Sequence, residues 1–213
     1  DGNLVFSSKQ HILLPEESAK KLPLQNFAIE ARVRIDQAQK WGSILSYSQD
    51  NGSYERGWIL GYNGSRFSFR LSTGDRLLEV AAPESFEPGE WNHLFATYDG
   101  KKMGLYLNGR LVSSQIVTGP IVLPDIPTPF VIGAYKDKDE FFPINGRIES
   151  LQFHDSPPTQ NELASIAKKF AVVPFSVRPL QFFSDFHSML FALLFSAASA
   201  FAPAPAPTAT CSL

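Results

Sequence analysis

Alternation of apolar and polar residues along the chain predicts a protein built mainly of β-strands. The clearest case is segment 27–35, where apolar Phe27, Ile29, Ala31, Val33 and Ile35 alternate with polar residues that include Glu30, Arg32 and Arg34. Successive side chains of a strand point to opposite faces, so this pattern predicts one face in a core and a charged face in water. The same reasoning predicts strands at 4–6, 11–15, 42–48, 57–62, 66–72, 77–81, 130–133 and 147–154.

Segment 91–114 predicts a meander of three antiparallel strands. It contains two hairpin signals, Asp99-Gly100 and Asn108-Gly109. Both dipeptides suit two-residue type I′ turns, in which both central residues have positive φ. Trp91 and His93 fall on one face of the first strand, and we expect both to have structural roles in the core between the sheets.

A short helix is expected after the last strand. Thr159 as N-cap and Glu162 at the third helical position form a capping-box arrangement, and the helix is expected to run to about Lys169. Many short strands separated by turn signals predict a sandwich of two antiparallel sheets, and the chain has no internal repeat. The predicted fold class is therefore all-β with a short C-terminal helix.

Composition agrees with a folded chain and excludes one class of partner. The 213 residues are 44% hydrophobic and 19% charged, and the formal net charge is −2. Nucleic acid is not expected as a partner, because phosphate binding needs a clustered basic face. Cys211 is the only cysteine, so no disulfide forms within the chain. The first residue is Asp rather than Met, so we expect a processed or cut segment, with any N-terminal targeting sequence outside it.

The end of the chain differs in composition, and we expect a domain at residues 1–172 followed by a separate tail at 173–213. Residues 189–200 form an apolar run that ends in small residues, and residues 202–207 alternate Ala with Pro. The run is shorter than the roughly 20 residues of a membrane-spanning helix. Two interpretations stay open: a read-through segment that is no part of the fold, and a hydrophobic anchor with weak membrane association.

Five short motifs follow one another at a specific spacing between residues 91 and 154. They are Trp91-x-His93, Thr97-Tyr98-Asp99-Gly100, Leu105-Tyr106-Leu107-Asn108-Gly109, Val131-Ile132-Gly133 and the run from Gly146 to His154. As a set they resemble the laminin G-like members of the concanavalin A-like lectin and glucanase superfamily, although Glu149 and Leu151 stand where that family often has Asp and Val. The resemblance covers residues 1–170 and implies a jelly-roll sandwich. It also implies a non-catalytic binding or adhesion module within a larger secreted or surface protein.

Two loops rich in oxygen atoms provide a candidate metal site. Asp50 and Asn51 stand in one loop, and Asp137 and Asp139 stand in the other. Calcium takes about six to eight oxygen ligands from carboxylates, amides and carbonyls. The two loops also resemble the calcium loops of pentraxins, except that Tyr135 stands where that family has an acidic ligand. We therefore expect calcium as a candidate cofactor, and a pair of solvated turns without an ion is the alternative.

Aromatic residues near these loops are candidates for ligand binding. The candidates for a sugar-stacking platform are Trp41, Tyr54, Trp58, Tyr62 and Tyr135. An aromatic ring offers an apolar face and, in Tyr and Trp, a polar tip. Trp58 alternates with Leu60 and is expected in the core. Tyr54, Tyr135 and Glu140 lie beside the acidic loops and are the expected ligand-binding residues.

The chain lacks the spacing of catalytic motifs that hydrolases carry. Glycosidases need a pair of carboxylates that face one cleft, and no expected strand contains Glu-x-Asp-x-x-Glu or Glu-x-x-x-Glu. The histidines do not have zinc-site spacing, and no Gly-x-Ser-x-Gly motif occurs. We therefore expect no enzyme, but an extracellular module that recognises carbohydrate or a surface glycoprotein. The alternative is an accessory domain of a larger secreted hydrolase, such as a metallophosphoesterase or a glycosidase, with no ligand of its own.

Overall fold

The computed structural model describes residues 3–7, 9–15, 17–18, 21, 26–50, 54–74 and 76–171. Two of the expectations above lie outside these residues, namely the tail at 173–213 and the ligand role of Asn51. Within the described ranges, no helix combines the length and the apolar character that crossing a membrane needs.

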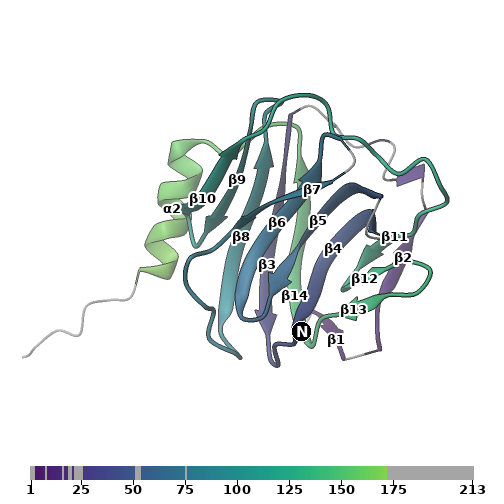
Figure 1. Cartoon of the computed structure of the whole chain (residues 1–213). Helices are drawn as coiled ribbons and strands as arrows, with labels where there is room; N and C mark the ends of the chain where they lie inside the picture. Colours follow the sequence, from purple (N-terminus) through teal and green to yellow (C-terminus); the bar gives the residue numbers. More distant parts are fainter. Residues whose placement is uncertain are drawn as a thin grey trace, which may run out of the picture. The chain divides into compact units, whose positions relative to one another are not determined.

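Two antiparallel sheets, each with six strands among the described residues, face one another (Figure 1). The first contains, in spatial order, β1 (Leu4–Phe6), β14 (Gly146–His154), β3 (Phe27–Ile35), β8 (Trp91–Tyr98), β9 (Lys102–Leu107) and β10 (Arg110–Ile116). The second contains β2 (Ile12–Leu14), β11 (Phe130–Ile132), β4 (Trp41–Asp50), β5 (Glu55–Asn63), β6 (Arg66–Ser72) and β7 (Leu77–Ala81). This arrangement confirms the predicted all-β sandwich.

Aromatic side chains fill the space between the two sheets. The largest fully buried side chains include Trp58, Tyr47, Tyr62, Tyr98, Phe67 and Phe69. The Trp58 ring meets the rings of Phe130 and Phe153 edge-on, at 5.6 and 5.9 Å between centroids, a favourable arrangement of aromatic rings. Trp58 therefore belongs to the core, as predicted, and buried Tyr62 is likewise removed from the candidates for a sugar platform.

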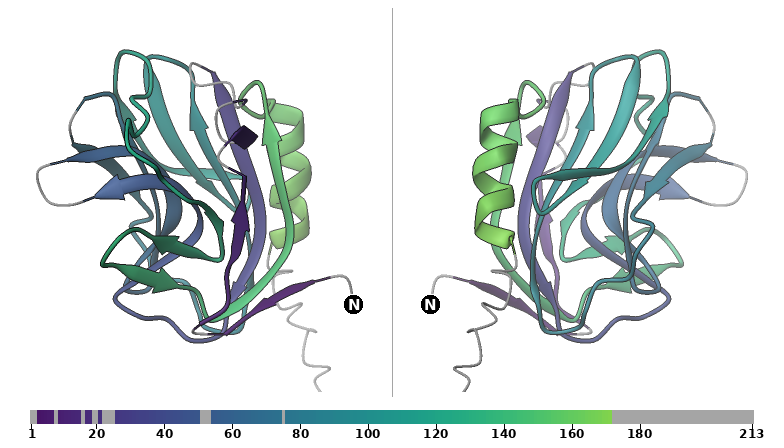
Figure 2. Two further views of the ribbon diagram at one scale, coloured as in Figure 1. Left: turned by 90° about the vertical axis from the view of Figure 1, so that its right-hand side faces the viewer. Right: turned by 90° about the vertical axis from the view of Figure 1, so that its left-hand side faces the viewer.

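One helix, α2 (Gln160–Phe170), covers the outer face of the first sheet (Figure 2). The predicted capping box is present, because the Thr159 side chain accepts a hydrogen bond from Glu162 N and the Glu162 side chain accepts one from Thr159 N. Leu163 is the buried residue of the helix and packs with Ala28 and Phe95. The helix therefore gives the first sheet a second, small apolar layer on its outer side.

The two predicted turns of the meander differ from one another. Asn108 and Gly109 have φ values of 52° and 79°, which confirms a type I′ turn. Asp99 does not have positive φ, so the prediction for the other turn was wrong. Its side chain instead accepts hydrogen bonds from the backbone N–H groups of Lys101 and Lys102, at 2.9 and 2.7 Å, and this makes a longer turn than Asp-Gly alone predicts.

The predicted positions of Trp91 and His93 between the sheets were also wrong. The core face of β8 carries Leu94, Ala96 and Tyr98, so Trp91 and His93 lie on the outer face. His93 is buried there beside the helix residue Phe170, at 6.2 Å between ring centroids. Alternation assigned these residues correctly to one face, but it does not reveal that a helix lies over that face.

Glu30, expected to face water, also lies on this outer face. Its carboxylate binds two histidines, with 2.7 Å to His93 Nε2 and 2.8 Å to His154 Nε2. The Glu30 side chain is 23% exposed. A charged residue on an alternating strand can therefore be held in a polar cluster beside the helix instead of in solvent.

A small hairpin lies against the outer side of the second sheet. It consists of β12 (Ala134–Lys136) and β13 (Phe141–Pro143). Ser46 of β4 donates its hydroxyl to Ala134 O at 2.9 Å, and Gly133 N donates to Ile44 O at 2.8 Å. Gln39 Nε2 donates to Pro143 O. These contacts fix the hairpin beside β4 and create the space described next.

Candidate functional site

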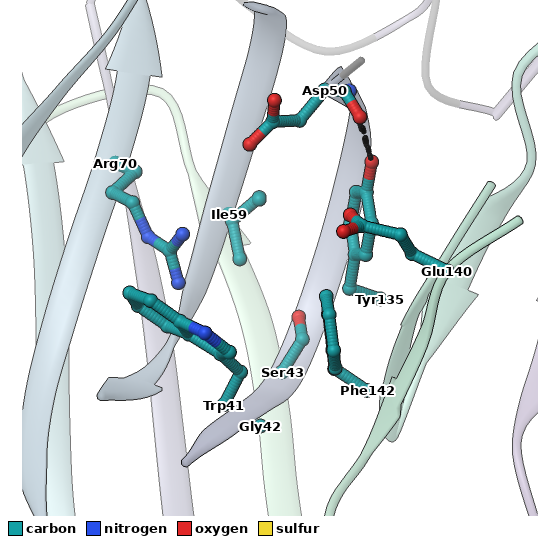
Figure 3. A pocket seen from close by; sticks show the side chains of 9 residues that line it. All are labelled: Trp41, Gly42, Ser43, Asp50, Ile59, Arg70, Tyr135, Glu140 and Phe142. Carbon is teal, nitrogen blue, oxygen red and sulfur yellow. Dashed lines mark hydrogen bonds between the residues drawn. The ribbon is translucent and has the colours of Figure 1, made fainter. Parts of the chain in front are cut away.

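A cavity of about 250 Å³ lies between the outer face of the second sheet and the β12–β13 hairpin (Figure 3). The residues that line it are Trp41, Gly42, Ser43, Asp50, Ile59, Arg70, Tyr135, Glu140 and Phe142. Strand alternation places the sheet residues here, because their neighbours Leu60 and Leu71 point into the core. The cavity therefore combines aromatic, apolar and charged surfaces on one side of the sandwich.

The sheet side of the cavity is formed by Trp41 and Arg70. The Arg70 guanidinium lies over the Trp41 ring, 4.9 Å from its centroid. Its Nε lies 3.6 Å from Glu79 Oε1, and the Arg70 side chain is only 17% exposed. Burial lowers the pKa of Arg70, while Glu79 and Asp50 oppose that shift. A guanidinium has an ordinary pKa above 12, so Arg70 stays charged at neutral pH.

The hairpin side of the cavity is formed by two stacked rings. The centroids of Tyr135 and Phe142 lie 5.9 Å apart, and their planes differ by 18°. The Tyr135 hydroxyl donates to Asp137 Oδ2 at 2.6 Å and accepts a hydrogen bond from Asp50 N at 2.9 Å. Burial, and then the hydrogen bond to Asp137, raise the pKa of Tyr135. Its hydroxyl therefore stays protonated and ties the end of β4 to the hairpin.

Asp137 organises the loop that brings Glu140 to the cavity. Its Oδ1 accepts hydrogen bonds from the backbone N–H groups of Asp139 and Glu140, at 3.1 and 2.7 Å. The Glu140 carboxylate is then turned toward the cavity (Figure 3). Burial raises the pKa of Glu140, and Asp137, Asp50 and Asp139 raise it further by repulsion. An added positive charge would relieve this repulsion.

The structure brings together four of the predicted site residues, which are Asp50, Tyr135, Asp137 and Glu140. Asp139 belongs to the same loop, where its backbone N–H binds Asp137. The predicted proximity of the strand end at Asp50 and the loop after β12 is therefore observed. The pKa of Glu140 responds to all three neighbouring aspartates, which agrees with a compact group of carboxylates.

Tyr54 lies apart from this group. Its hydroxyl donates to Asp125 Oδ1 at 2.5 Å, and Arg56 Nη1 lies 2.8 Å from Asp125 Oδ2. The Arg56 guanidinium also lies over the Tyr54 ring, 4.6 Å from its centroid. Tyr54 therefore binds the loop that contains Asp125, and it does not line the cavity.

Sequence reasoning missed Arg70 and Phe142. Alternation along β6 does place Arg70 opposite the core residues Phe69 and Leu71, and this pattern was visible in the sequence. Nothing in the sequence, however, separates an outward arginine in solvent from one beside a tryptophan of another strand. Phe142 could not be assigned either, because its role depends on how the hairpin folds over β4.

Calcium fits the described residues only in part. No group of three or more His, Cys, Asp or Glu side chains within the described ranges is arranged to hold a metal ion. Both carboxylate oxygens of Asp137 already accept hydrogen bonds. Asn51, one of the predicted ligands, lies outside those ranges. The proposed ligand set of Asp50, Asn51, Asp137 and Asp139 therefore stays a prediction.

The two-sheet architecture is that of a concanavalin A-like β-sandwich domain. The chain belongs to the laminin G-like group of the concanavalin A-like lectin and glucanase superfamily, because the family described as "Concanavalin A-like lectin/glucanases superfamily" matches residues 6–164. Pappalysin-1 of Mus musculus is 33% identical over 108 residues, which cover 45% of this chain and 7% of that protein. The aligned part is thus a small fraction of that relative.

Two solved structures of carbohydrate complexes share the fold. The CBM40 of the Ruminococcus gnavus IT-sialidase, bound to α2,3-sialyllactose, is 18% identical with a TM-score of 0.65, and the match covers 78% of this chain and 97% of that chain. Domain 4 of the extracellular arabinanase AbnA from Geobacillus stearothermophilus, in complex with arabinotriose, is 15% identical with a TM-score of 0.57, and the match covers 76% and 75%. Identities this low establish the fold alone.

Proposed function

We propose that this domain binds carbohydrate in the cavity between the second sheet and the β12–β13 hairpin, as a non-catalytic module. The single observation that carries the proposal is the composition of the cavity, in which the Trp41 ring lies beside Arg70, Asp50 and Glu140. A sugar ring has apolar C–H faces and a polar rim of hydroxyls. Aromatic faces with a few convergent polar groups suit both parts of such a ligand.

The arrangement of charges would favour one orientation of a bound sugar in the cavity. Arg70 only donates hydrogen bonds, whereas the carboxylates of Asp50 and Glu140 accept them when ionised. Hydroxyl groups can donate to the two carboxylates, and oxygen atoms at the other end of the ring can accept from Arg70. The ring face would then rest on Trp41.

Similar proteins support this proposal. The fold is shared with a domain bound to sialyllactose and with a domain bound to arabinotriose. Both belong to larger carbohydrate-active enzymes by their descriptions, and the match to pappalysin-1 spans 7% of that protein. These likenesses support the proposal that this module is part of a larger extracellular protein, with a glycan or a glycoprotein as its partner. Calcium at Asp50, Asn51, Asp137 and Asp139 is a separate proposal, because an ion there would neutralise carboxylates that otherwise act on the cavity.

Glycoside hydrolysis is a second candidate, because two carboxylates line the same cavity. Asp50 and Glu140 both face it, and burial raises the pKa of Glu140. An acid with a raised pKa beside an ionised carboxylate is the pattern of glycosidase sites. Binding is preferred here because neither carboxylate belongs to a catalytic motif of the sequence and the structures that share the fold include carbohydrate-binding domains.

A glycan array, followed by titration calorimetry with the best glycan, tests the proposal. We expect Trp41→Ala to reduce affinity at least about tenfold, since tryptophans in contact with ligand often supply a large share of binding energy. Trp91→Ala is the matched control, because Trp91 packs against Arg32 and Arg34 on the other sheet. Unchanged affinity in Trp41→Ala, or no glycan bound at all, would overturn the proposal. Cleavage of the bound glycan, lost in Glu140→Gln, would favour the hydrolase.

A further inference from the structure

The cavity carries an excess of negative charge. Its lining includes one cationic side chain, Arg70, and two acidic ones, Asp50 and Glu140. The positive charge is already offset by Glu79, whose Oε1 lies 3.6 Å from Arg70 Nε. Two more acidic residues, Asp137 and Asp139, act on Glu140 from the hairpin loop. A ligand therefore meets a negative potential at the end of the cavity formed by the hairpin.

Glu140 is the focus of this excess charge. The negative charge of Asp50 raises the pKa of Arg70 on the sheet side of the cavity and the pKa of Glu140 on the hairpin side. No described side chain donates a hydrogen bond or forms an ion pair with the Glu140 carboxylate in the structure. Lys136, which belongs to the same hairpin, lies over the Phe141 ring at 5.9 Å. The carboxylate is half-buried, turned toward the cavity and repelled by its neighbours.

We infer that the sugar bound here carries a free amino group, as in an unacetylated hexosamine. This inference rests on the proposed carbohydrate function. The ammonium group would lie between the carboxylates of Asp50 and Glu140, beside the hydroxyl of Tyr135. The ring face would lie on Trp41, and sugar oxygens would accept hydrogen bonds from Arg70. Hydrogen bonds in which both partners are charged are stronger than neutral ones.

An acidic sugar fits the same cavity less well. Its carboxylate could reach Arg70, but it would add a third negative charge beside Asp50 and Glu140 in a partly buried space, where screening by water is weak. An N-acetylated sugar loses the positive charge and adds bulk at the same atom. We therefore expect the cavity to bind amino sugars most tightly, N-acetylated sugars less tightly and acidic sugars most weakly.

Titration calorimetry of the full chain with three tetrasaccharides tests this order. The probes are the tetramers of glucosamine, N-acetylglucosamine and galacturonic acid, in 0.15 M salt, which corresponds to a screening length of about 8 Å. We expect the glucosamine tetramer to bind at least about tenfold more tightly than the N-acetylated one, which is the scale of one charge-assisted hydrogen bond. The preference should weaken as salt is raised.

Glu140→Gln should weaken binding of the amine more than binding of the N-acetylated sugar, so that most of the preference for the amine is lost. Glu87→Gln, at an exposed loop position, is the matched control and should leave all three affinities unchanged. Equal binding of the amine and the acetylated sugar, or tighter binding of the acidic sugar, would overturn the inference and leave the carbohydrate function standing. Failure to bind any glycan on the array or in solution would overturn both.

Discussion

The guanidinium of Arg70 lies over the ring of Trp41, 4.9 Å from the ring centroid. The two residues come from different strands, β6 and β4, which are separated by β5 in the sheet. Their side chains therefore meet across an intervening strand and form a continuous wall of the cavity. The stack orients the guanidinium, whose planar fork offers donors in a fixed direction.

Arg70→Lys should weaken glycan binding about tenfold although the charge is kept. A lysine lacks the planar fork and stacks less well on an aromatic ring. Arg66→Gln, at an exposed position of the same strand, serves as the control and should leave binding unchanged. Affinity measured by calorimetry is the readout, and equal affinity of Arg70→Lys and the unaltered protein would contradict a role for the fork.

The raised pKa of Glu140 predicts a dependence on pH. The folded state disfavours the ionised form of this carboxyl, so its contribution to stability is fully present below the ordinary pKa of Glu and is lost as pH rises through the raised pKa. Glu140→Gln should therefore raise the melting temperature at pH 7, and the difference should vanish at acidic pH, where Glu140 is protonated. Thermal unfolding at a series of pH values measures this.

Binding of an amino sugar should show the opposite dependence at the same residue. Binding of the amine needs ionised Glu140. As the solution is acidified, the affinity should therefore begin to fall at a higher pH than it would with a glutamate of ordinary pKa. A glucosamine affinity that stays constant through the acidic range in which Glu140 gains its proton would exclude this residue as the partner of the amine.

Gly133→Ala should destabilise the domain by about 2 kcal/mol or more, through backbone strain and a clash. Gly133 has a φ of 82°, and an added Cβ would lie 2.3 Å from an atom of the Phe6 ring. Urea unfolding followed by fluorescence gives the free energy of unfolding. Gly74→Ala is the control, because Gly74 has no positive φ in the left-handed region and no atom within 4 Å of an added Cβ. Equal stability of the two variants would show that the Phe6 contact gives way easily.

Glu30→Gln should destabilise the domain by about 1–3 kcal/mol. The Glu30 carboxylate accepts from both His93 and His154, whereas an amide has one oxygen and would leave a buried histidine with a poorer partner. Chemical denaturation is again the measurement. Glu84→Gln, at an exposed loop position, is the control and should leave the free energy of unfolding unchanged. An equally small effect of Glu30→Gln would mean that the hydrogen bonds of Glu30 to the two histidines do not contribute to stability.

Millimolar calcium should raise the melting temperature of the full chain if the predicted ligand set binds it. A ligand at 100 times its Kd stabilises the native state by about 2.7 kcal/mol, which corresponds to several degrees for a domain of this size. A chelator should reverse the shift, and Asp139→Asn should reduce it. An unchanged melting temperature at 10 mM calcium would overturn the proposal of a calcium site.

Much of the fold could be predicted from local patterns. The strands at 66–72 and 77–81 have the predicted bounds, because alternation and turn residues act over a few neighbouring positions. The capping box at Thr159 and the type I′ turn at Asn108 are likewise local. The prediction for the turn at Asp99 failed because the Asp99 side chain accepts hydrogen bonds from the backbone of Lys101 and Lys102. A rule based on the Asp-Gly dipeptide does not include that alternative.

The candidate site could be predicted only in part. The sequence singled out Asp50, Tyr135 and Glu140, because acidic loops and aromatic residues stand out, and these residues do meet in the structure. It also grouped Tyr54 with them, although that residue binds Asp125. Nearness along the chain is a weak guide to nearness in space, since loops leave a sheet in directions that their sequences do not encode.

Local patterns in the sequence specify most of the strands, the alternation of side chains along them, the capped helix and the family, because each depends on periodicity or on motifs of neighbouring residues. The two strands of the β12–β13 hairpin were not predicted. The tertiary structure decided which outer face received the helix, that Glu30 would bind two histidines, and that Arg70 would lie over Trp41. The physical reason is that these contacts join residues from separate strands. Their formation depends on sheet order and on the position of the β12–β13 hairpin, which only the packed domain specifies.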